Sequence, residues 1–411
     1  MNFQLQPVTE QGRRFAELVE KHAADFAARA DEHDRKGDFP FENIEDLKRS
    51  GAMAATVPVE YGGLGVESVH DLAVGINRLG RGDGSTAIGV TMHLFRPWRM
   101  TRRLKAVREG GNAAGTRPLE DDLKLIGGGK KVIAALLSEA GTDLASPMVE
   151  AKKTEGGWLI SGAKIFGTMS EAADTFEITC RIWDGDSGYK RAIATVPGDS
   201  PGIESRADWD ALGMRGSGSH TIVFSDCFVP ESSLTVVSPW GVWTEGILVS
   251  TGVINLALMA VFLGIAESAR DIAVETAKTR RNGPNEAPLS YSPSIRQTIA
   301  EIEIELAASR AVLGRSASFA DEFLGGHADG DMPLDELKDL AKDIQCSKWT
   351  ITRKAIDIVD KAMTVSGGSA YLASSVLSRL YRDVRAGPFM QPFSPNEAFD
   401  FIGKITLGLE V

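Results

Sequence analysis

The spacing of apolar residues changes twice along this chain of 411 residues, and that change limits the possible folds. Apolar residues recur at three- and four-residue steps up to about residue 130, alternate between about 131 and 240, and then return to helical steps. Steps of three and four are typical of helices, and alternation is typical of strands. The order predicts an α+β protein: an all-helical domain over 1–130, a β-domain over 131–240 and a helical bundle over 241–411.

The N-terminal part is predicted to hold several helices, one of them over 73–94. Gly82-Asp83-Gly84-Ser85 interrupts that pattern, and Ser85 is its predicted N-cap. His93 lies among apolar neighbours, which favours a core residue, although a place beside a ligand would make it a weak catalytic candidate. A basic cluster follows and is predicted to be a solvated helix face, the alternative being a contact for an anionic substrate: Arg96, Arg99, Arg102, Arg103 and Lys105.

The middle part contains short alternating segments separated by Gly, Pro, Asp and Ser turns. They cover 132–137, 158–162, 176–182, 191–197, 202–204 and 221–229. This spacing predicts an antiparallel barrel or sandwich. A turn-rich loop precedes the last segment, and Gly216 and Gly218 in it permit a close approach of the backbone or a positive φ.

The C-terminal part is predicted to form a four-helix bundle. Its helices cover 256–277, a segment that begins at Pro293, 334–364 and 375–385, and Gly367-Gly368 ends the third.

Composition narrows the class of protein. The net charge of -11 argues against binding to nucleic acid or to an anionic membrane surface. The three cysteines are far apart, which excludes a disulfide framework and a zinc site and fits a reducing cytoplasm. No signal segment is visible, and the longest apolar run, 252–265, is predicted to be a buried helix rather than a membrane span.

Two segments resemble the acyl-CoA dehydrogenase superfamily of flavoenzymes. They are LGMRGSGSHTIVFSDCFVP at 212–230 and VPVEYGGLG at 57–65, and the order of helices, strands and helices agrees with that fold over nearly the whole chain. The resemblance implies a bound flavin, FAD by preference with FMN as the alternative. The sequence has no GxGxxG after a predicted strand, which argues against a Rossmann enzyme.

The resemblance also implies where the flavin ring would lie. Residues 137–143 resemble the superfamily's TEPxAGSD loop, with two residues fewer, and carry over Leu137 and Ser138 as ring contacts and Thr142 as a phosphate or substrate contact. Residues 164–170 resemble its KxWITN segment, so Phe166 would cover the ring and the Thr168 hydroxyl would face the central nitrogen.

The resemblance further implies an oligomer. Arg280 matches an arginine that binds the FAD diphosphate of a neighbouring subunit, and Gly367 and Gly368 match a turn that meets the same cofactor. This predicts at least a dimer, the family norm being a tetramer. The usual phenylalanine and glutamine after the arginine are missing, and Thr364 replaces a glutamine before the glycines.

The superfamily's catalytic base is absent from the two places where it is expected. Aligned through Arg382-Asp383-Val384-Arg385, the chain has Gln391 at the glutamate's position, and the alternative position on the long helix holds Ile254. An amide cannot abstract the α-proton of an acyl-CoA. Glu245 and Glu397 remain as candidates for a relocated base, each more often a solvated charge.

The C-terminal tail resembles a second branch of the fold, the monooxygenases that use reduced flavin. Met390 stands where many of them carry a histidine. In this reading Ser138 and Thr168 hydrogen-bond the reacting flavin, while Phe166, Trp98 and Phe389 exclude water and Trp98, Phe389 and Met390 line the substrate pocket. We therefore predict a monooxygenase acting on a small organic substrate with reduced flavin from a separate reductase. The alternatives are an acyl-CoA dehydrogenase with a relocated base and an inactive flavin-binding scaffold. The substrate itself is not indicated.

Overall fold

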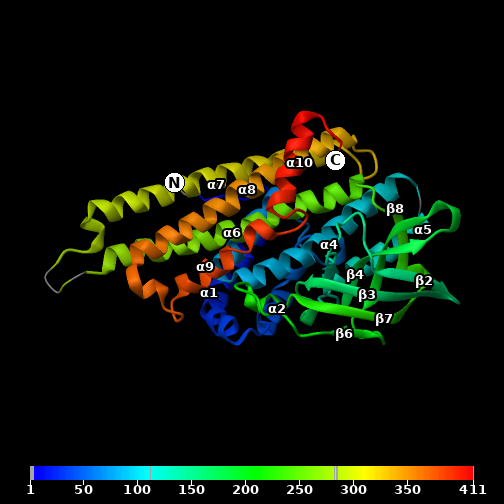
Figure 1. Cartoon of the computed structure of the whole chain (residues 1–411), viewed down its shortest axis with the longest axis horizontal. Helices are drawn as coiled ribbons and strands as arrows, with labels where there is room; N and C mark the ends of the chain where they lie inside the picture. Colours follow the sequence, from blue (N-terminus) through cyan, green and yellow to red (C-terminus); the bar gives the residue numbers. More distant parts are fainter. Residues whose placement is uncertain (1–3, 112, 282, 284–285, 411) are drawn as a thin grey trace.

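The computed structural model describes residues 4–111, 113–281, 283 and 286–410, and it confirms the predicted α+β class. In Figure 1 the sheet lies at one end of the molecule, the long helices of the C-terminal part run side by side away from it, and the N-terminal helices pack between them. The N-terminal helices are α1 (Glu10–Lys36), α2 (Phe41–Ser50), α3 (Val69–Gly82), α4 (Gly84–Glu109) and α5 (Ala113–Gly127).

The start of α4 differs from the prediction. The residue that caps it is Asp83, not Ser85, because the Asp83 carboxylate accepts hydrogen bonds from the backbone N–H of Ser85 (3.2 Å) and of Thr86 (3.0 Å). An acidic side chain at a helix N-terminus satisfies free N–H groups and interacts favourably with the helix dipole.

The middle part forms one continuous eight-stranded sheet. Its order is β6-β7-β3-β2-β4-β5-β8, with β1 paired to β4. The pairing of β3 with β7 places Gly167 opposite His220, which brings the predicted flavin-contact segment 164–170 next to the glycine-rich loop that precedes β7. The strands are β1 (Ile133–Leu136), β2 (Glu150–Thr154), β3 (Gly157–Gly167), β4 (Thr175–Trp183), β5 (Tyr189–Pro197), β6 (Ile203–Ser205), β7 (His220–Pro230) and β8 (Leu234–Pro239).

The C-terminal part has a fifth helix that the sequence reading missed. Its helices are α6 (Glu245–Thr279), α7 (Pro293–Gly326), α8 (Leu334–Ser366), α9 (Val376–Val384) and α10 (Pro395–Leu407). Helix α6 is apolar enough to cross a membrane by composition, with a mean hydropathy of 2.2 in its apolar window, but 89% of that window is buried against other parts of the protein. It is the central core helix, as predicted for its apolar run.

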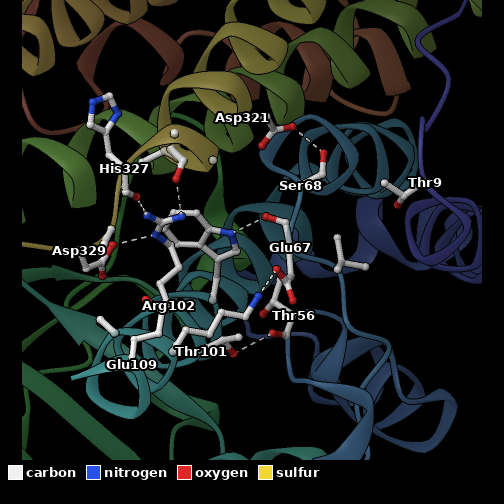
Figure 2. A pocket seen from close by; sticks show the side chains of 18 of the residues that line it. Thr9, Thr56, Glu67, Ser68, Thr101, Arg102, Glu109, Asp321, His327 and Asp329 are labelled. Atoms are coloured by element: carbon white, nitrogen blue, oxygen red, sulfur yellow. Dashed lines mark hydrogen bonds and ion pairs between the residues drawn. The ribbon is translucent and has the colours of Figure 1, made fainter. Parts of the chain in front are cut away.

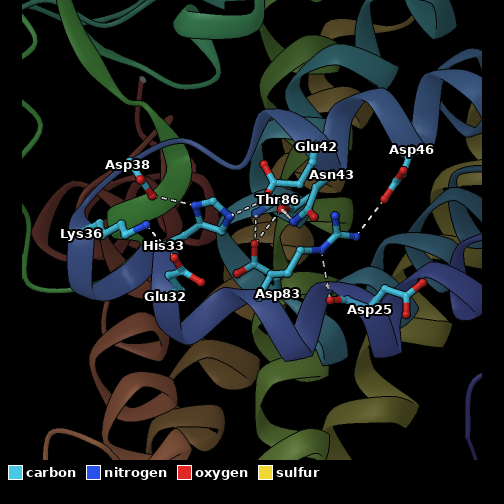
Figure 3. A network of polar contacts seen from close by, with 11 residues as sticks. Asp25, Glu32, His33, Lys36, Asp38, Glu42, Asn43, Asp46, Asp83 and Thr86 are labelled. Carbon is cyan, nitrogen blue, oxygen red and sulfur yellow. Dashed lines mark hydrogen bonds and ion pairs between the residues drawn. The ribbon is translucent and has the colours of Figure 1, made fainter.

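A polar network fastens α1 to α2 and to the start of α4 (Figure 3). His33 lies between the carboxylates of Asp38 (2.6 Å) and Glu42 (2.7 Å). Burial opposes its charge, but the hydrogen bonds that the ring donates to these two carboxylates raise the pKa of His33 above the usual value. The Asn43 amide donates to the Thr86 hydroxyl (2.8 Å). These bonds therefore fix the C-terminal end of α1, to which the glycine-rich loop before β7 is also bonded.

Candidate flavin site

The glycine-rich loop 212–219 is held by the N-terminal and the C-terminal helices at once. The Met214 N–H donates to the Asp383 carboxylate on α9 (2.7 Å), and the Arg215 Nε donates to the Asp34 carbonyl on α1 (2.9 Å). A Cβ on Gly213 would lie 2.3 Å from the backbone of Arg382, so only glycine permits this approach. Burial raises the pKa of Asp383 to about 6, despite Arg379 nearby.

The same loop is bonded to the end of β3. The Met169 N–H donates to the Ser217 carbonyl (2.9 Å), and the Ser170 hydroxyl donates to the Gly218 carbonyl (3.0 Å). Phe166, Met169 and Met214 all have positive φ, at 55°, 63° and 54°. Non-glycine residues seldom adopt this conformation, and where several do so together the cost is commonly tied to function. This loop and the end of β3 are therefore the candidate site.

A hydroxyl and an aromatic ring face the open side of this junction. The Thr168 hydroxyl bonds to the Ser219 hydroxyl (2.9 Å), which bonds in turn to the Ser217 hydroxyl (2.7 Å). Phe166 is 57% exposed and meets Trp209 edge-to-face, with ring centroids 6.1 Å apart. An exposed aromatic ring beside a polar hydroxyl suits the face and the edge of a flavin ring. Sequence reasoning missed Ser217, Ser219 and Trp209.

The loop after β1 lies against the same segment. The Ser138 carbonyl accepts from the Ile165 N–H (3.0 Å), so Ser138 lies beside the segment that carries Phe166 and Thr168. Within the described part of the chain no hydrogen bond engages the Ser138 hydroxyl, which is half-buried and available to a ligand. The Thr142 hydroxyl, in contrast, donates to the Ser146 carbonyl of its own loop. Leu137 packs partly buried beside Leu144.

A buried ion pair fixes this loop. The ammonium group of Lys164, whose side chain is fully buried, lies 2.6 Å from the Glu139 carboxylate and 2.9 Å from the Thr179 hydroxyl. Burial lowers the Lys164 pKa, and the neighbouring Glu139 opposes that shift. The other oxygen of Glu139 accepts from the N–H groups of Met148 and Val149. This pair orients the loop from within the sheet, where a ligand has no access.

Two buried side chains, the amide of Asn255 and the amine of Lys348, hold the turn at the family's base position. Asn255 on α6 donates from its Nδ2 to the Gln391 carbonyl (2.7 Å), and Lys348 on α8 donates to the carbonyls of Met390 and Phe393 (2.8 Å for Phe393). Burial lowers the Lys348 pKa to about 7. The Gln391 side chain is exposed, so the turn presents an amide and no carboxylate.

The two carboxylates considered as relocated bases cap backbone groups. Glu245 accepts from the Gly330 N–H (2.8 Å), and Glu397 accepts from the Ser394 N–H (2.7 Å) in a capping box that starts α10. Ile254 is a buried apolar residue of α6. Glu245 and Glu397 therefore have structural contacts, and Ile254 has no titratable group.

His93 is a buried structural residue. It has no exposed surface, its Nδ1 accepts from the Ile133 N–H (3.1 Å), and its Nε2 is 3.0 Å from the Met53 carbonyl, to which it donates. Burial lowers its pKa to about 4, so the ring is neutral at pH 7. Both nitrogens are occupied, which leaves neither for a ligand and favours the core interpretation of this histidine.

Trp98 lines a cavity of about 680 Å³ between α4, residues 66–68 and the end of α7 (Figure 2). Its indole N–H donates to the Glu67 carbonyl (2.8 Å). Arg103 and Lys105 of the basic cluster are exposed, as predicted for a solvated face, whereas Arg96 is buried and paired with Glu177. Arg102 is paired with Asp329 (2.8 Å) at the cavity. The acidic side chains in the lining outnumber the basic ones, so the cavity does not favour a diphosphate.

The remaining predicted contacts are divided between two places. Phe389 is 62% exposed, and Met390 packs against the main core at the clamped turn. Arg280 and Gly367 are brought together, since the Arg280 guanidinium donates to the Ser366 carbonyl and to the Ser369 hydroxyl (3.3 Å), and a Cβ on Gly367 would lie 3.5 Å from it. Gly368 belongs to the same turn. Figure 1 shows this end of α6 at the opposite end of the molecule from the sheet.

Comparison with known proteins identifies the family. Residues 9–97, 137–227 and 256–393 match the family models for the N-terminal, middle and C-terminal domains of acyl-CoA dehydrogenase. The chain belongs to the acyl-CoA dehydrogenase superfamily. The resemblance stated from sequence is thereby confirmed, and the protein is a flavin-dependent oxidoreductase of this superfamily.

Within the superfamily, the chain is similar to enzymes that act on amino sugars. It is 33% identical to the L-evernosamine nitrososynthase of a Micromonospora species, over 98% of this chain and 92% of that protein. It is 30% identical to the amino sugar nitrososynthase DnmZ of Streptomyces peucetius, over 98% and 95%. The structure of KijD3 in complex with FMN and dTDP-3-amino-2,3,6-trideoxy-4-keto-3-methyl-D-glucose has a TM-score of 0.90 and 32% identity and covers 100% of this chain and 98% of that one. These similarities agree with the predicted monooxygenase that uses reduced flavin.

Proposed function

We propose that this protein is an FMN-dependent monooxygenase that oxidises the amino group of a nucleotide-linked amino sugar to a nitroso group. The similarity to nitrososynthases extends over nearly the full length of both chains, so it includes the residues around the candidate site as well as the fold. The observation that carries the proposal is the turn at Gln391, where acyl-CoA dehydrogenation requires a carboxylate and the chain presents an amide.

Oxidation of an amine fits a site without a carbon-directed base. In the first step R-NH₂, O₂ and FMNH₂ give R-NHOH, H₂O and FMN. In the second, R-NHOH, O₂ and FMNH₂ give R-NO, two H₂O and FMN. The amine nitrogen supplies its own lone pair, so no carboxylate has to abstract a proton from carbon. Each step consumes one reduced flavin, and the sequence shows no nicotinamide-binding motif, so we infer a separate reductase as the partner.

The contacts of Arg280 support FMN in preference to FAD. The guanidinium group donates to the Ser366 carbonyl and the Ser369 hydroxyl, so it closes the C-terminal end of α8 of its own chain. FMN has no adenosine diphosphate for this arginine to bind. The flavin reported with KijD3, the similar protein of known structure, is also FMN.

The chain's own residues have distinct tasks in this proposal. Reduced FMN, when bound, would supply the electrons that activate O₂. Phe166 would cover the ring, the Thr168 and Ser138 hydroxyls would hydrogen-bond its polar edge, and the buried pair of Lys164 and Glu139 holds the Ser138 loop in place. Lys348 and Asn255 hold the turn at Gln391, which offers an amide where acyl-CoA dehydrogenation needs a carboxylate.

The test is a reconstituted reaction. The protein is incubated in air with FMN, a flavin reductase, NADH and a dTDP-linked amino sugar, and the sugar nucleotide is followed by mass spectrometry. We expect a product that has gained one oxygen and lost two hydrogens, with the hydroxylamine appearing first. Bleaching of bound flavin by an acyl-CoA without air, together with no change in the sugar, would instead establish the dehydrogenase. Failure to take up FMN would leave the inactive scaffold.

A further inference from the structure

Helix α4 carries three arginines at three-residue intervals, and one of them lacks a close partner. Arg96 is buried and paired with Glu177. Arg102 donates to the Asp329 carboxylate (2.8 Å) and to two backbone carbonyls (3.2 Å each), as Figure 2 shows for the carboxylate. Arg99 makes no hydrogen bond among the described residues, and the carboxylate paired with it, that of Asp329, is 3.9 Å away, beyond hydrogen-bond distance.

The charges around Arg99 leave one positive charge without a close partner. Two carboxylates, those of Glu177 and Asp329, serve the three arginines, and each is already bonded to another arginine. Glu245, the acidic residue in the first turn of α6, is bonded to the backbone N–H of Gly330 (2.8 Å). The guanidinium group of Arg99 therefore keeps its hydrogen-bond donors for an anion from outside the chain.

Arg99 lies in a recess and not on an open helix face. Burial lowers the pKa of its guanidinium group, and the neighbouring Asp329 opposes that shift, yet the side chain is 27% exposed. The group is thus surrounded by protein and still open to solvent. An ion pair formed in such a recess is screened less by water and salt than one on an exposed surface.

The recess borders the loop that carries Ser138. A Cβ on Gly246, in the first turn of α6, would lie 3.9 Å from the Arg99 guanidinium group. The next residue, Ile247, belongs to the same apolar cluster as Leu137, the residue before Ser138. Arg99 is therefore separated from the candidate flavin site by the first turn of α6 and the apolar cluster beneath it, which places it next to the site and outside it.

We propose that Arg99 binds the diphosphate of the nucleotide-linked amino sugar and so selects substrates that carry a nucleotide. The inference rests on the proposed function. In such a substrate the sugar ring lies between the diphosphate and the amine, so an amine held at the flavin requires a cation beside the flavin site and not within it. A planar guanidinium group can donate two parallel hydrogen bonds to phosphate oxygens. The acidic cavity at Trp98 offers no such excess of positive charge.

The experiment measures the dissociation constant of dTDP by isothermal titration calorimetry in the presence of FMN, for the full-length wild type and for Arg99→Gln. We expect dTDP to bind the variant about ten- to a hundredfold more weakly, the range for hydrogen bonds to a charged group. The wild-type affinity should also fall more steeply with salt than that of the variant, because the variant lacks the charge. The dissociation constant of FMN should stay within about twofold of the wild type.

Arg103→Gln is the matched control, because Arg103 is exposed on the same helix and its loss changes the net charge equally. It should leave the dissociation constant of dTDP within about twofold of the wild type. Arg99→Lys keeps the charge without the planar fork and should give an intermediate value. Circular dichroism and thermal melting establish that the variants fold, and Arg99→Lys replaces Arg99→Gln if the latter does not.

The reconstituted reaction separates binding from chemistry. With Arg99→Gln, the KM of the dTDP-linked amino sugar should rise while kcat stays within about threefold, as for the loss of a contact made equally in the ground and transition states. Equal dissociation constants of dTDP in Arg99→Gln and Arg103→Gln would overturn the inference. Weaker FMN binding with unchanged dTDP binding would do the same and would assign Arg99 to the flavin phosphate. A wild type that binds FMN and not dTDP would reject the nucleotide-linked substrate of the proposed function, and this inference with it.

Discussion

The pH dependence of unfolding should distinguish a structural His93 from a catalytic one. Burial lowers the pKa of His93 to about 4, whereas an unfolded histidine titrates near 6.5, a difference of about 2.5 units. The unfolded chain therefore binds the proton first, and the stability that neutral His93 contributes is complete above pH 6.5 and is lost as the pH falls toward 4. A pH of 5 lies about 1.5 units below the pKa of the unfolded histidine. At 1.36 kcal/mol per unit, this lowers the free energy of unfolding by about 2 kcal/mol.

The assay is urea unfolding of the wild type and of His93→Gln at pH 7.5, 6 and 5, at one protein concentration. Glutamine can accept from the Ile133 N–H and donate to the Met53 carbonyl, as His93 does, but it does not titrate. We expect the wild type to lose about 2 kcal/mol more than the variant between pH 7.5 and 5, because all other histidines are common to both. Equal losses would refute the neutral, buried ring, and a stable variant without activity would support a catalytic one.

Three further predictions concern the candidate site. Gln391→Ala should change the rate of amine oxidation less than tenfold, measured by product formation under single turnover, whereas a loss of about two to four orders of magnitude would mean that Gln391 takes part in proton transfer. Arg280→Ala should leave the dissociation constant of FMN unchanged and lower the melting temperature, and weaker flavin binding would indicate a diphosphate contact. Lys164→Met should destabilise the protein by about 3–5 kcal/mol in urea unfolding because it leaves Glu139 buried and unpaired, and the double variant with Glu139→Gln should recover part of that loss; strict additivity would contradict the pair.

The sequence predicted those helices and strands in which apolar residues repeat with the spacing typical of the element. The strand over 176–182 and the helix over 334–364 have long apolar repeats, and they correspond to β4 (Thr175–Trp183) and α8 (Leu334–Ser366). Strand β2, with the sequence EAKKT, has no such repeat, because its place depends on pairing with β3. Helix α10 had a readable signal in Ser394, Pro395 and Glu397, since serine, proline and glutamate at these positions form a capping box. This helix was nevertheless not among those predicted.

The site was predictable to the extent that it depends on local motifs. Ser138, Phe166 and Thr168 follow from two short segments, and the structure places these segments side by side. A role at the site could not be assigned to Ser217 and Ser219. The Ser219 hydroxyl contacts Thr168 only because of the register of β3 with β7, which no local pattern specifies. For the same reason the sequence did not indicate that Arg96, in the basic cluster of α4, is buried and that several members of the cluster are paired. The cluster's partners Glu177, Asp329 and Glu67 come from three distant segments.

The residues that hold the glycine-rich loop are separate from the turn at the family's base position, which explains how this chain keeps the fold without the base. Within the described part of the chain, the side-chain hydrogen bonds of Arg382 and Asp383, the residues that aligned the tail, go to partners other than the turn at Gln391. Asp383 holds the glycine-rich loop through Met214, and Arg382 binds the Asp34 carboxylate of α1 (2.8 Å). These contacts would serve any reaction that places the flavin ring at the proposed site beside β3, whereas the base position lies on a separate turn held by Lys348 and Asn255. Exchanging glutamate for glutamine on that turn removes proton abstraction from carbon and leaves the supports of the flavin site in place, so a change of reaction requires few residues.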